Sequence, residues 1–403
     1  SPFIFGVATA SFQIEGSHNT RLPCIWDTFC SKPNTIADNS NGNHACEHVK
    51  YWQQDVQMIA DLAVDAYRLS ISWPRVLHQD GSLNIQGMSF YKSLLQALKA
   101  RNIKTYVTLY HWDLPLALQL EDNGWLGHKI SDYFAAYADV CFKNFGDRVK
   151  NWITLNESWV VAILGYGQGV FAPGRVSTSE PYQAAHHLIL AHAKAVHVFR
   201  DKYSYQNGQI GITNNCDWRE PLTNKQEDKD AAQRALEFFL AWFADPIYTG
   251  DYPQVMKDRL GDRLPEFSEK EKELIKGTSD FFGLNHYTTM YAAHSDGNNK
   301  EENVYGNGGI SEDQDVDLSL DPQWKVTLMQ WAVVPWGCKK MLHWIKQRYN
   351  NPDIYITENG CAYPDELING EVDDQDRLEF YKGYLEACRE AINEGVKLKG
   401  YFA

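Results

Sequence analysis

The sequence predicts an α/β fold, a (β/α)8 TIM barrel that occupies residues 1–403 as a single domain. Short segments rich in β-branched residues alternate with amphipathic helical stretches along the chain, a pattern typical of a parallel sheet covered by helices. No G-x-G-x-x-G follows the first segment, which argues against an open dinucleotide-binding sheet. No linker rich in Pro, Gly or Ser divides the chain. Because barrels of this kind often reach about 250 residues or more as one unit, the length fits a single barrel.

Eight segments are predicted to be barrel strands because they are short and rich in β-branched or aromatic residues. In chain order they are residues 5–10, 66–73, 104–112, 151–157, 209–215, 281–287, 353–358 and 399–403. The helical stretches between them have apolar residues at helical spacing and cover residues 47–62, 89–101, 130–145, 182–203, 231–243, 336–348 and 374–393. The sequence stops at Ala403, so we expect an eighth strand that is cut short and a barrel that this chain leaves unclosed.

The composition is that of a globular protein, with 44% hydrophobic and 22% charged residues. No apolar run approaches the ~20 residues that span a bilayer, so we expect no membrane segment. With 38 basic and 52 acidic residues the net charge is −14, which repels nucleic acid and anionic lipid. The 13 Trp and 22 Tyr residues suit the binding of neutral, ring-shaped ligands, and equally suit an aromatic core.

The eight cysteines are too few for a small disulfide scaffold. Cys24, Cys30 and Cys46 lie close together in the sequence and could form one disulfide, but spacing alone does not choose a pair. No C-x-x-C occurs, and no cluster has the spacing of metal ligands. The chain begins at Ser1 without a secretion-type apolar segment. We therefore expect a processed product or a fragment, and the sequence leaves a cytoplasmic or an extracellular location open.

Residues 294–321, after the sixth predicted strand, form an acidic segment with eight Asp or Glu and one Lys. One interpretation is a solvated insertion. The other is a lid at the mouth of the barrel, because the loops that follow barrel strands surround barrel active sites.

Polar and aromatic residues gather where the predicted strands end, which is where barrel enzymes place their active sites. Glu157 ends the fourth strand and Glu358 the seventh, so two carboxylates face one barrel mouth. A pair of carboxylates is the apparatus of glycosidic bond cleavage, and Trp stacks on the apolar faces of sugar rings. The accompanying residues at strand ends are Gln13, Glu15, Arg68, His111, Trp112, Asn156, Asn285 and Tyr287.

Seven motifs give the sequence a family resemblance over its whole length. It resembles the β-glucosidases of glycoside hydrolase family 1, and within them the animal branch of cytosolic β-glucosidase and lactase-like domains. The motifs are FGVATASFQIEG (5–16), YRLSISW (67–73), TLYHWDLP (108–115), WITLNES (152–158), FFGLNHYTT (281–289), VVPWG (333–337) and YITENG (355–360). The resemblance implies a retaining enzyme that hydrolyses terminal β-D-glucosides and short β-linked oligosaccharides through a covalent glycosyl-enzyme, with no metal and no organic cofactor.

The resemblance also implies a role for each matching residue. Glu157 matches the acid/base and Glu358 the nucleophile. Arg68 and Tyr287 match residues that orient the nucleophile and balance its charge. The residues that match contacts to the sugar or the leaving group are Gln13, His111, Asn156, Asn285 and Trp331.

Physical chemistry supports the same division of roles. A nucleophile must be ionised, so Glu358 needs Arg68 and Tyr287 beside it to lower its pKa. The negative charge on Glu358 would raise the pKa of Glu157, and this effect disappears once the glycosyl-enzyme forms. Retention requires the two carboxyl groups to lie roughly 5 Å apart, whereas inversion requires ~6.5–9.5 Å.

Two other classes of function remain as alternatives. One is a non-catalytic, klotho-like domain that binds a glycan or a receptor, which the loss of a carboxylate would favour. The other is a metal-dependent barrel aldolase or isomerase, which would need a Lys or a metal cluster at the strand ends.

The sequence departs from the family pattern in two places. Ser158 stands where the family often has Pro. The family motif beyond the eighth strand, which supplies a Trp and a Glu to the sugar, lies beyond Ala403. We therefore expect the chain to be weakly active or inactive. The choice among glucose, galactose and fucose stays open, as do the aglycone preference and the oligomeric state.

Overall fold

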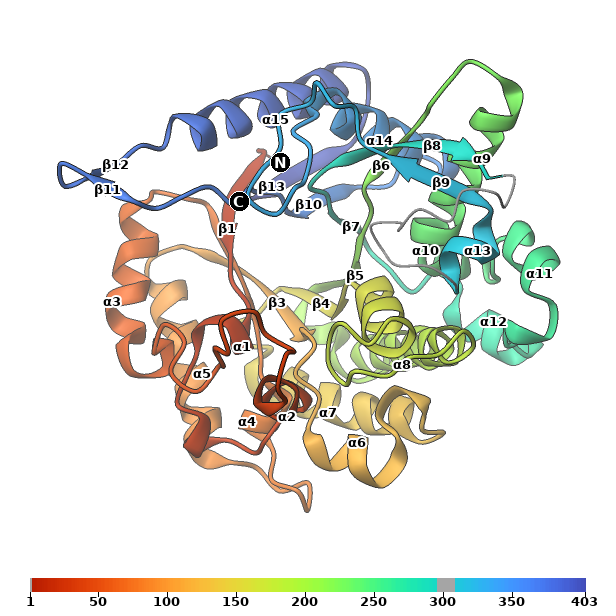
Figure 1. The fold of residues 1–403 in the computed structure, drawn as a ribbon. Helices are drawn as coiled ribbons and strands as arrows, with labels where there is room; N and C mark the ends of the chain where they lie inside the picture. Colours follow the sequence, from red (N-terminus) through yellow and green to blue (C-terminus); the bar gives the residue numbers. More distant parts are fainter. Residues whose placement is uncertain (1, 296–308) are drawn as a thin grey trace.

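The chain folds into a closed barrel of eight parallel strands surrounded by helices (Figure 1). The computed structural model describes residues 2–295 and 309–403. This architecture confirms the predicted fold class, and each of the eight predicted strands contributes to the barrel. In chain order its strands are β1 (Ile4–Ala8), β2 (Ala66–Ser70), β3 (Lys104–Tyr110), β4 (Asn151–Asn156), β5 (Gln209–Asn215), β7 (Phe282–Asn285), β10 (Ile354–Glu358) and β13 (Leu398–Phe402).

The barrel closes between its first and last strands, so the expectation of an unclosed barrel is wrong. Strand β13 pairs in parallel with β10 on one side and with β1 on the other. The main-chain N–H of Ala403 donates to Gly6 O at 3.0 Å, and the N–H of Ala8 donates to Ala403 O at 3.0 Å. The barrel strands of this molecule are short, so the last five strand residues before Ala403 are enough to fill both ladders.

One layer of the barrel interior is filled by apolar side chains from six different places in the chain. They are Ile4, Ala66, Tyr106, Ile153, Phe281 and Phe402. Phe402 is fully buried, and its ring occupies the space beside Gly6, where an added Cβ would lie 2.5 Å from the ring. Glycine at position 6 therefore lets β13 approach β1 closely. Like other barrels of this class, the interior is a packed core.

The long helices lie where the apolar periodicity predicts them. They are α3 (His48–Asp61), α5 (Ile85–Ala100), α7 (Ile130–Phe145), α8 (Glu180–Tyr203), α14 (Pro335–Arg348) and α15 (Gln375–Asn393). The predicted helix at 231–243 differs, because it is divided into α9 (Gln226–Leu236), a π-helical turn η5 (Glu237–Ala241) and α10 (Trp242–Thr249). A second π-helical segment, η3 (Val160–Gly167), follows β4.

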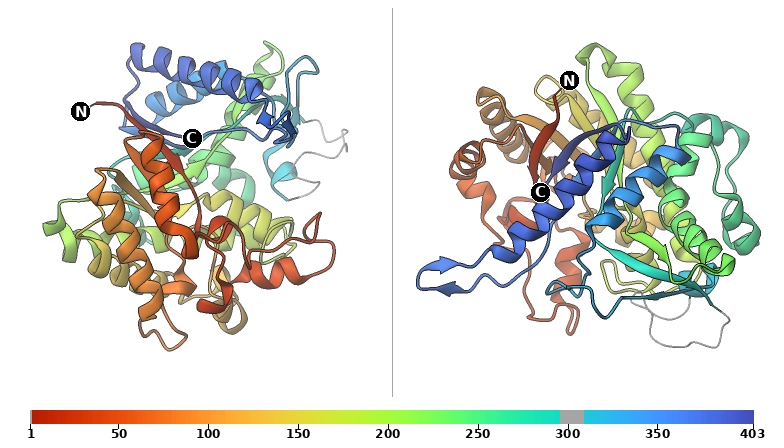
Figure 2. Two further views of the ribbon diagram at one scale, coloured as in Figure 1. Left: turned by 90° about the vertical axis from the view of Figure 1, so that its left-hand side faces the viewer. Right: turned by 90° about the horizontal axis from the view of Figure 1, so that it is seen from above.

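Shorter elements connect these parts. The short helices are α1 (Ser11–Ile14), α2 (Ile25–Ser31), α4 (Trp73–Val76), α6 (Leu116–Asp122), α11 (Gln254–Leu260), α12 (Glu269–Ile275) and α13 (Ile310–Gln314). The 3-10 turns are η1 (His18–Thr20), η2 (Gly124–Leu126), η4 (Ser204–Gln206) and η6 (Gly261–Arg263). A hairpin of β11 (Leu367–Ile368) and β12 (Glu371–Val372) projects from the body of the molecule before α15 (Figure 2).

The acidic segment 294–321 is only partly described, because residues 296–308 lie outside the described residues. Its remaining part contains α13 and β9 (Val316–Ser319), which pairs with β8 (Thr289–His294) in a small sheet completed by β6 (Trp218–Pro221). None of its described residues lines the cavity at the barrel mouth. The lid interpretation stays a prediction.

Two further expectations concerned a disulfide near the N-terminus and a membrane segment. All eight cysteines are free thiols, so the structure does not form the disulfide considered for Cys24, Cys30 and Cys46. Within residues 2–295 and 309–403, no helix combines the length and apolar character needed to cross a bilayer.

Candidate active site

A cavity of about 580 Å³ opens at the carboxyl ends of the barrel strands. Both glutamates predicted from the sequence line it, Glu157 just after β4 and Glu358 at the end of β10. The strand ends bring them together, although they are far apart in the sequence. The other predicted site residues that line the cavity are Gln13, His111, Tyr287 and Trp331.

Glu358 is held by two donors, one on each carboxylate oxygen. Arg68 Nη1 lies 2.7 Å from Oε1, and the Tyr287 hydroxyl donates to Oε2 at 2.6 Å. Burial raises the pKa of Glu358, but the charge of Arg68 and the bonds from Tyr287 and Arg68 outweigh burial and leave that pKa below its usual value. The carboxyl group is therefore ionised at neutral pH, as a nucleophile must be.

The pKa of Glu157 is shifted in the opposite direction, to about 8. Burial is the largest cause and the negative charge of Glu358 is the second, while Asn285 and Arg68 oppose them. The sequence argument named Glu358 as the cause, and the structure adds burial as the larger one. A carboxyl group with this pKa keeps its proton near neutral pH and can act as a general acid.

The three other predicted site residues, Arg68, Asn156 and Asn285, lie behind the cavity. Asn156 Oδ1 accepts from Arg68 Nη2 at 2.7 Å and from Asn285 Nδ2 at 3.0 Å. Asn285 Oδ1 in turn accepts from the Thr357 hydroxyl at 2.7 Å. This buried network joins β2, β4, β7 and β10 below the two glutamates, and a fully bonded network of this kind fixes the side chains that it joins.

His111 is a neutral, buried residue that lines the cavity. Burial lowers its pKa to about 4. The Asn156 amide nitrogen lies 3.1 Å from His111 Nε2, and an amide N–H can only donate, so Nε2 accepts and the proton sits on Nδ1. Among the described residues, the buried Nδ1 has no hydrogen-bond partner.

Two residues at the cavity have left-handed backbone conformations that are rare for non-glycine residues. They are Trp112, with φ 78°, and Glu157, with φ 53°. The Trp112 indole N–H donates to Asn156 O at 3.0 Å, next to Glu157. Strain of this kind persists only where the surrounding structure imposes it, and it clusters at functional sites.

Aromatic side chains form the outer walls of the cavity. Trp331 lies 5.1 Å from Tyr287 between ring centroids, and Trp159 stacks on Phe239 at 4.4 Å. Phe171 also lines the cavity, with its ring 5.7 Å from that of Trp112 between centroids. Trp331 was expected from the family resemblance, whereas Trp159, Phe171 and Phe239 were missed. Phe239 lies in the π-helical segment η5 and Trp159 directly precedes η3, and the apolar period does not reveal π-helical segments.

Asn215 and Asp217 also line the cavity and were missed. Asn215 ends β5 and Asp217 follows it, and no site residue was proposed for this strand. The run Asn214-Asn215-Cys216-Asp217 at a strand end was the available signal. Asp217 lies 3.6 Å from Arg219 Nη1 and contributes to the raised pKa of Glu157.

The described part of the chain contains no group of three or more His, Cys, Asp or Glu side chains placed to hold a metal ion. Glu157 and Glu358 bring two carboxyl groups with pKa values shifted in opposite directions to this cavity, where amide, imidazole and hydroxyl groups lie beside them.

Comparison with known sequences gives a match along the whole chain. The family described as glycosyl hydrolase family 1 matches residues 1–403. Beta-glucosidase 42 of Arabidopsis thaliana is 44% identical over 416 residues, which cover 100% of this chain and 84% of that protein. Beta-glucosidase 4 of Oryza sativa subsp. japonica is 44% identical over 420 residues, which cover 100% and 85%. These relatives are plant enzymes and do not support the expected likeness to the animal branch.

Solved structures agree with the sequence match. The rice Os3BGlu6 β-glucosidase superposes with a TM-score of 0.94 at 41% identity, over 100% of this chain and 89% of that one. A Glu-to-Gln mutant of the same rice enzyme, in a covalent complex with Glc, superposes equally well. A β-glucosidase from the fungus Humicola insolens in complex with glucose gives 0.93 at 36% identity, over 100% and 88%.

Proposed function

Because the chain belongs to glycosyl hydrolase family 1, we propose that it is a retaining β-glucosidase in which Glu358 is the nucleophile and Glu157 the acid/base. One observation carries the assignment of roles. The two carboxyl groups line one cavity, and their pKa values are shifted in opposite directions. Pairs of titratable groups with divergent pKa values mark the acid and the nucleophile.

In the first step Glu358 attacks the anomeric carbon of a β-glucoside while Glu157 donates its proton to the glycosidic oxygen. The bond between the anomeric carbon and the leaving oxygen breaks, and an ester bond to Glu358 forms. Arg68 and Tyr287 keep the carboxylate ionised and oriented before the attack. The leaving group departs as an alcohol.

In the second step the same two groups exchange tasks. Once Glu358 is esterified its negative charge is gone, so one of the two main causes of the raised pKa of Glu157 is removed. Glu157 is then a carboxylate that takes a proton from water, the water oxygen bonds to the anomeric carbon, and the ester to Glu358 breaks. Two displacements return the β-configuration.

The remaining residues either bind the substrate in this proposal or hold the residues that do. Gln13 and His111 hydrogen-bond the hydroxyl groups of the sugar. Asn156 and Asn285 act from behind the cavity by fixing His111, Arg68 and Glu157. Trp331 packs at the boundary between the sugar and the leaving group.

The proposal is tested with Glu358→Ala and azide. We expect the variant to lose turnover of an aryl β-glucoside and to regain activity with azide as an α-glucosyl azide, because the small anion takes the place of the missing carboxylate. NMR of the azide product identifies the anomer. Rescue that gives only the β-azide would remove Glu358 from the role of nucleophile.

The specificity within the family is tested separately on the wild-type protein. Matched aryl β-glucoside, β-galactoside and β-fucoside substrates, together with short β-linked oligosaccharides, show which sugar the cavity prefers. The likeness to the animal cytosolic and lactase-like enzymes remains a prediction from the motifs. Comparing this sugar preference with that of plant and animal enzymes of the family tests it.

A further inference from the structure

Gln13, proposed above to bind the sugar, lies on the four-residue helix α1, which has buried anchors at both ends. At the start, Ser11 N donates to Ser70 Oγ at 2.7 Å, and the Ser11 hydroxyl donates to Asp113 Oδ2 at 2.6 Å. Just after the end, Glu15 accepts from Arg75 Nε at 2.8 Å and from the Tyr91 hydroxyl at 2.5 Å.

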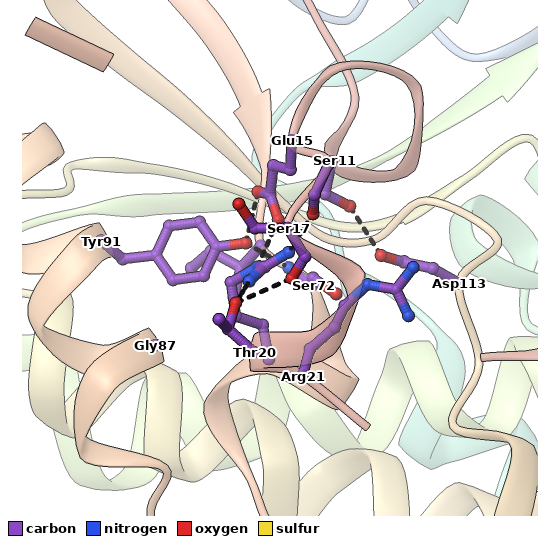
Figure 3. A network of polar contacts seen from close by, with 12 residues as sticks. Ser11, Glu15, Ser17, Thr20, Arg21, Ser72, Gly87, Tyr91 and Asp113 are labelled. Atoms are coloured by element: carbon purple, nitrogen blue, oxygen red, sulfur yellow. Dashed lines mark hydrogen bonds and ion pairs between the residues drawn. The ribbon is translucent and has the colours of Figure 1, made fainter. Parts of the chain in front are cut away.

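Figure 3 shows this arrangement, with Asp113 and Tyr91 on opposite sides of the loop that carries Ser11 and Glu15. Gln13 lies between the anchors in sequence and is itself exposed toward the cavity. A helix of four residues has little stability of its own. Its position is therefore set by these anchors.

Asp113 links this helix to a second part of the sugar site. It follows His111 by two residues, and its partner Ser11 precedes Gln13 by two residues. One hydrogen bond therefore joins the two segments that carry Gln13 and His111. Trp112, between His111 and Asp113, has the strained φ of 78°, so this segment needs contacts that hold it in place.

Burying the carboxyl group of Asp113 at this position lowers the stability of the folded protein. Its side chain is buried. Its Oδ1 has no hydrogen-bond partner among the described residues, and Arg21, whose charge interacts with Asp113, forms its ion pair with Asp27. Burial raises the pKa of Asp113 to about 6. Since burying a carboxyl group without an ionic partner costs stability, its presence here points to a task in the site.

We propose that Asp113 is a positioning residue that fixes Gln13 and His111 relative to each other through its hydrogen bond with Ser11. This inference rests on the proposed function, since Gln13 and His111 are taken as contacts to the sugar. Asp113 itself does not line the cavity, so it acts through the two residues that do. Misplacing such contacts by a small distance lowers catalysis strongly.

A double-mutant cycle between Asp113 and Gln13 tests the proposal. The rate constant kcat/KM on an aryl β-glucoside is measured for the wild type, Asp113→Ala, Gln13→Ala and the double variant. We expect Asp113→Ala to lower kcat/KM by about tenfold or more. In the Gln13→Ala background the same change should lower kcat/KM by a smaller factor than in the wild type, because only the contact of His111 is left for it to misplace.

The conservative variant Asp113→Asn keeps an oxygen that can accept from Ser11, so we expect its kcat/KM within about threefold of the wild type. Ser11→Ala removes the donor of the same hydrogen bond. Its effect on kcat/KM should therefore also be smaller in the Gln13→Ala background than in the wild type. If Asp113→Ala does not fold, Ser11→Ala decides the question.

Asp245→Ala is the matched control. Asp245 is also a buried carboxylate, bound to Arg348 and Tyr349 on the outer helices. We expect the Asp245→Ala change to lower the melting temperature. Any effect of this change on kcat/KM should be the same in the wild type and in the Gln13→Ala background. Equal losses from Asp113→Ala in the presence and absence of Gln13 would overturn the inference. A Gln13→Ala variant with unchanged kcat/KM would instead contradict the proposed role of Gln13 in sugar binding.

Discussion

Arg68 and Glu358 meet across the interior of the barrel, with Arg68 Nη1 2.7 Å from Glu358 Oε1. Their strands, β2 and β10, are not neighbours, since β1 and β13 lie between them in the closed barrel. Arg68 is almost fully buried and divides its donors between Glu358 and the network around Asn156. Closure of the barrel thus sets the charge state of the proposed nucleophile.

Replacing Arg68 by Met should move the acidic limb of the kcat/KM profile to higher pH. Arg68 lowers the pKa of Glu358, and only the ionised carboxylate attacks, so removing the cation raises the pH at which activity appears. The measurement is kcat/KM against pH. Arg348→Met, which breaks a pair on the outer helices, should leave the limb in place. An unmoved limb in Arg68→Met would show that other groups keep Glu358 ionised.

Replacing Asp217 by Asn should move the basic limb to lower pH. Activity falls with rising pH as Glu157, with its pKa of about 8, loses its proton. The charge of Asp217 contributes to that raised pKa, and its loss also leaves the positive charge of Arg219 less balanced. Both effects lower the pKa of Glu157. A basic limb that stays fixed or moves upward in Asp217→Asn would contradict this account.

Replacing Glu157 by Gln should harm substrates with poor leaving groups much more than activated aryl glucosides. An activated phenolate leaves with little protonation, whereas an alkoxide needs the proton that Glu157 supplies. Pre-steady-state rates of glycosylation on a series of leaving groups provide the measurement. Similar losses across the series would argue against Glu157 as the acid, while a steeper dependence on the leaving-group pKa supports it.

The strand ends were predictable from the sequence, because every proposed site residue except Trp331 follows or belongs to a β-rich run. Trp331 lies in the segment between β9 and α14 and was proposed from the family resemblance alone. Six of the nine lie in one cavity, and three support it from behind. Asp113 and Asp217 were missed as site residues for a physical reason. Their importance depends on partners that are distant in the sequence, Ser11 for one and Glu157 for the other, and no local pattern encodes those relationships.

The two π-helical segments were unpredictable for a different reason. The extra residue in each turn shifts the apolar face without leaving a periodic signal, and both segments supply wall residues such as Val160 and Phe239. Barrel closure was mispredicted because sequence patterns locate strand boundaries only to within a few residues. In the structure β13 is complete enough to pair on both sides.

Replacing Phe402 by Ala tests this closure directly. The ring fills the inner layer between Ile4 and Tyr106 and occupies the space beside Gly6. Its removal leaves a cavity at the junction of β1 and β13, so the free energy of unfolding should fall by about 3–5 kcal/mol. Urea unfolding followed by circular dichroism and by Trp fluorescence measures the loss.

Phe5→Ala is the matched control on the adjoining strand, where Phe5 pairs with Tyr401 but its side chain is half exposed. Because truncating it creates no enclosed cavity, we expect a loss of about 1 kcal/mol. A clearly smaller loss for Phe402→Ala than for Phe5→Ala would mean that the last strand contributes little to the folded barrel. A clearly larger loss of unfolding free energy for Phe402→Ala than for Phe5→Ala, found by both circular dichroism and Trp fluorescence, would establish that β13 is part of the cooperative core.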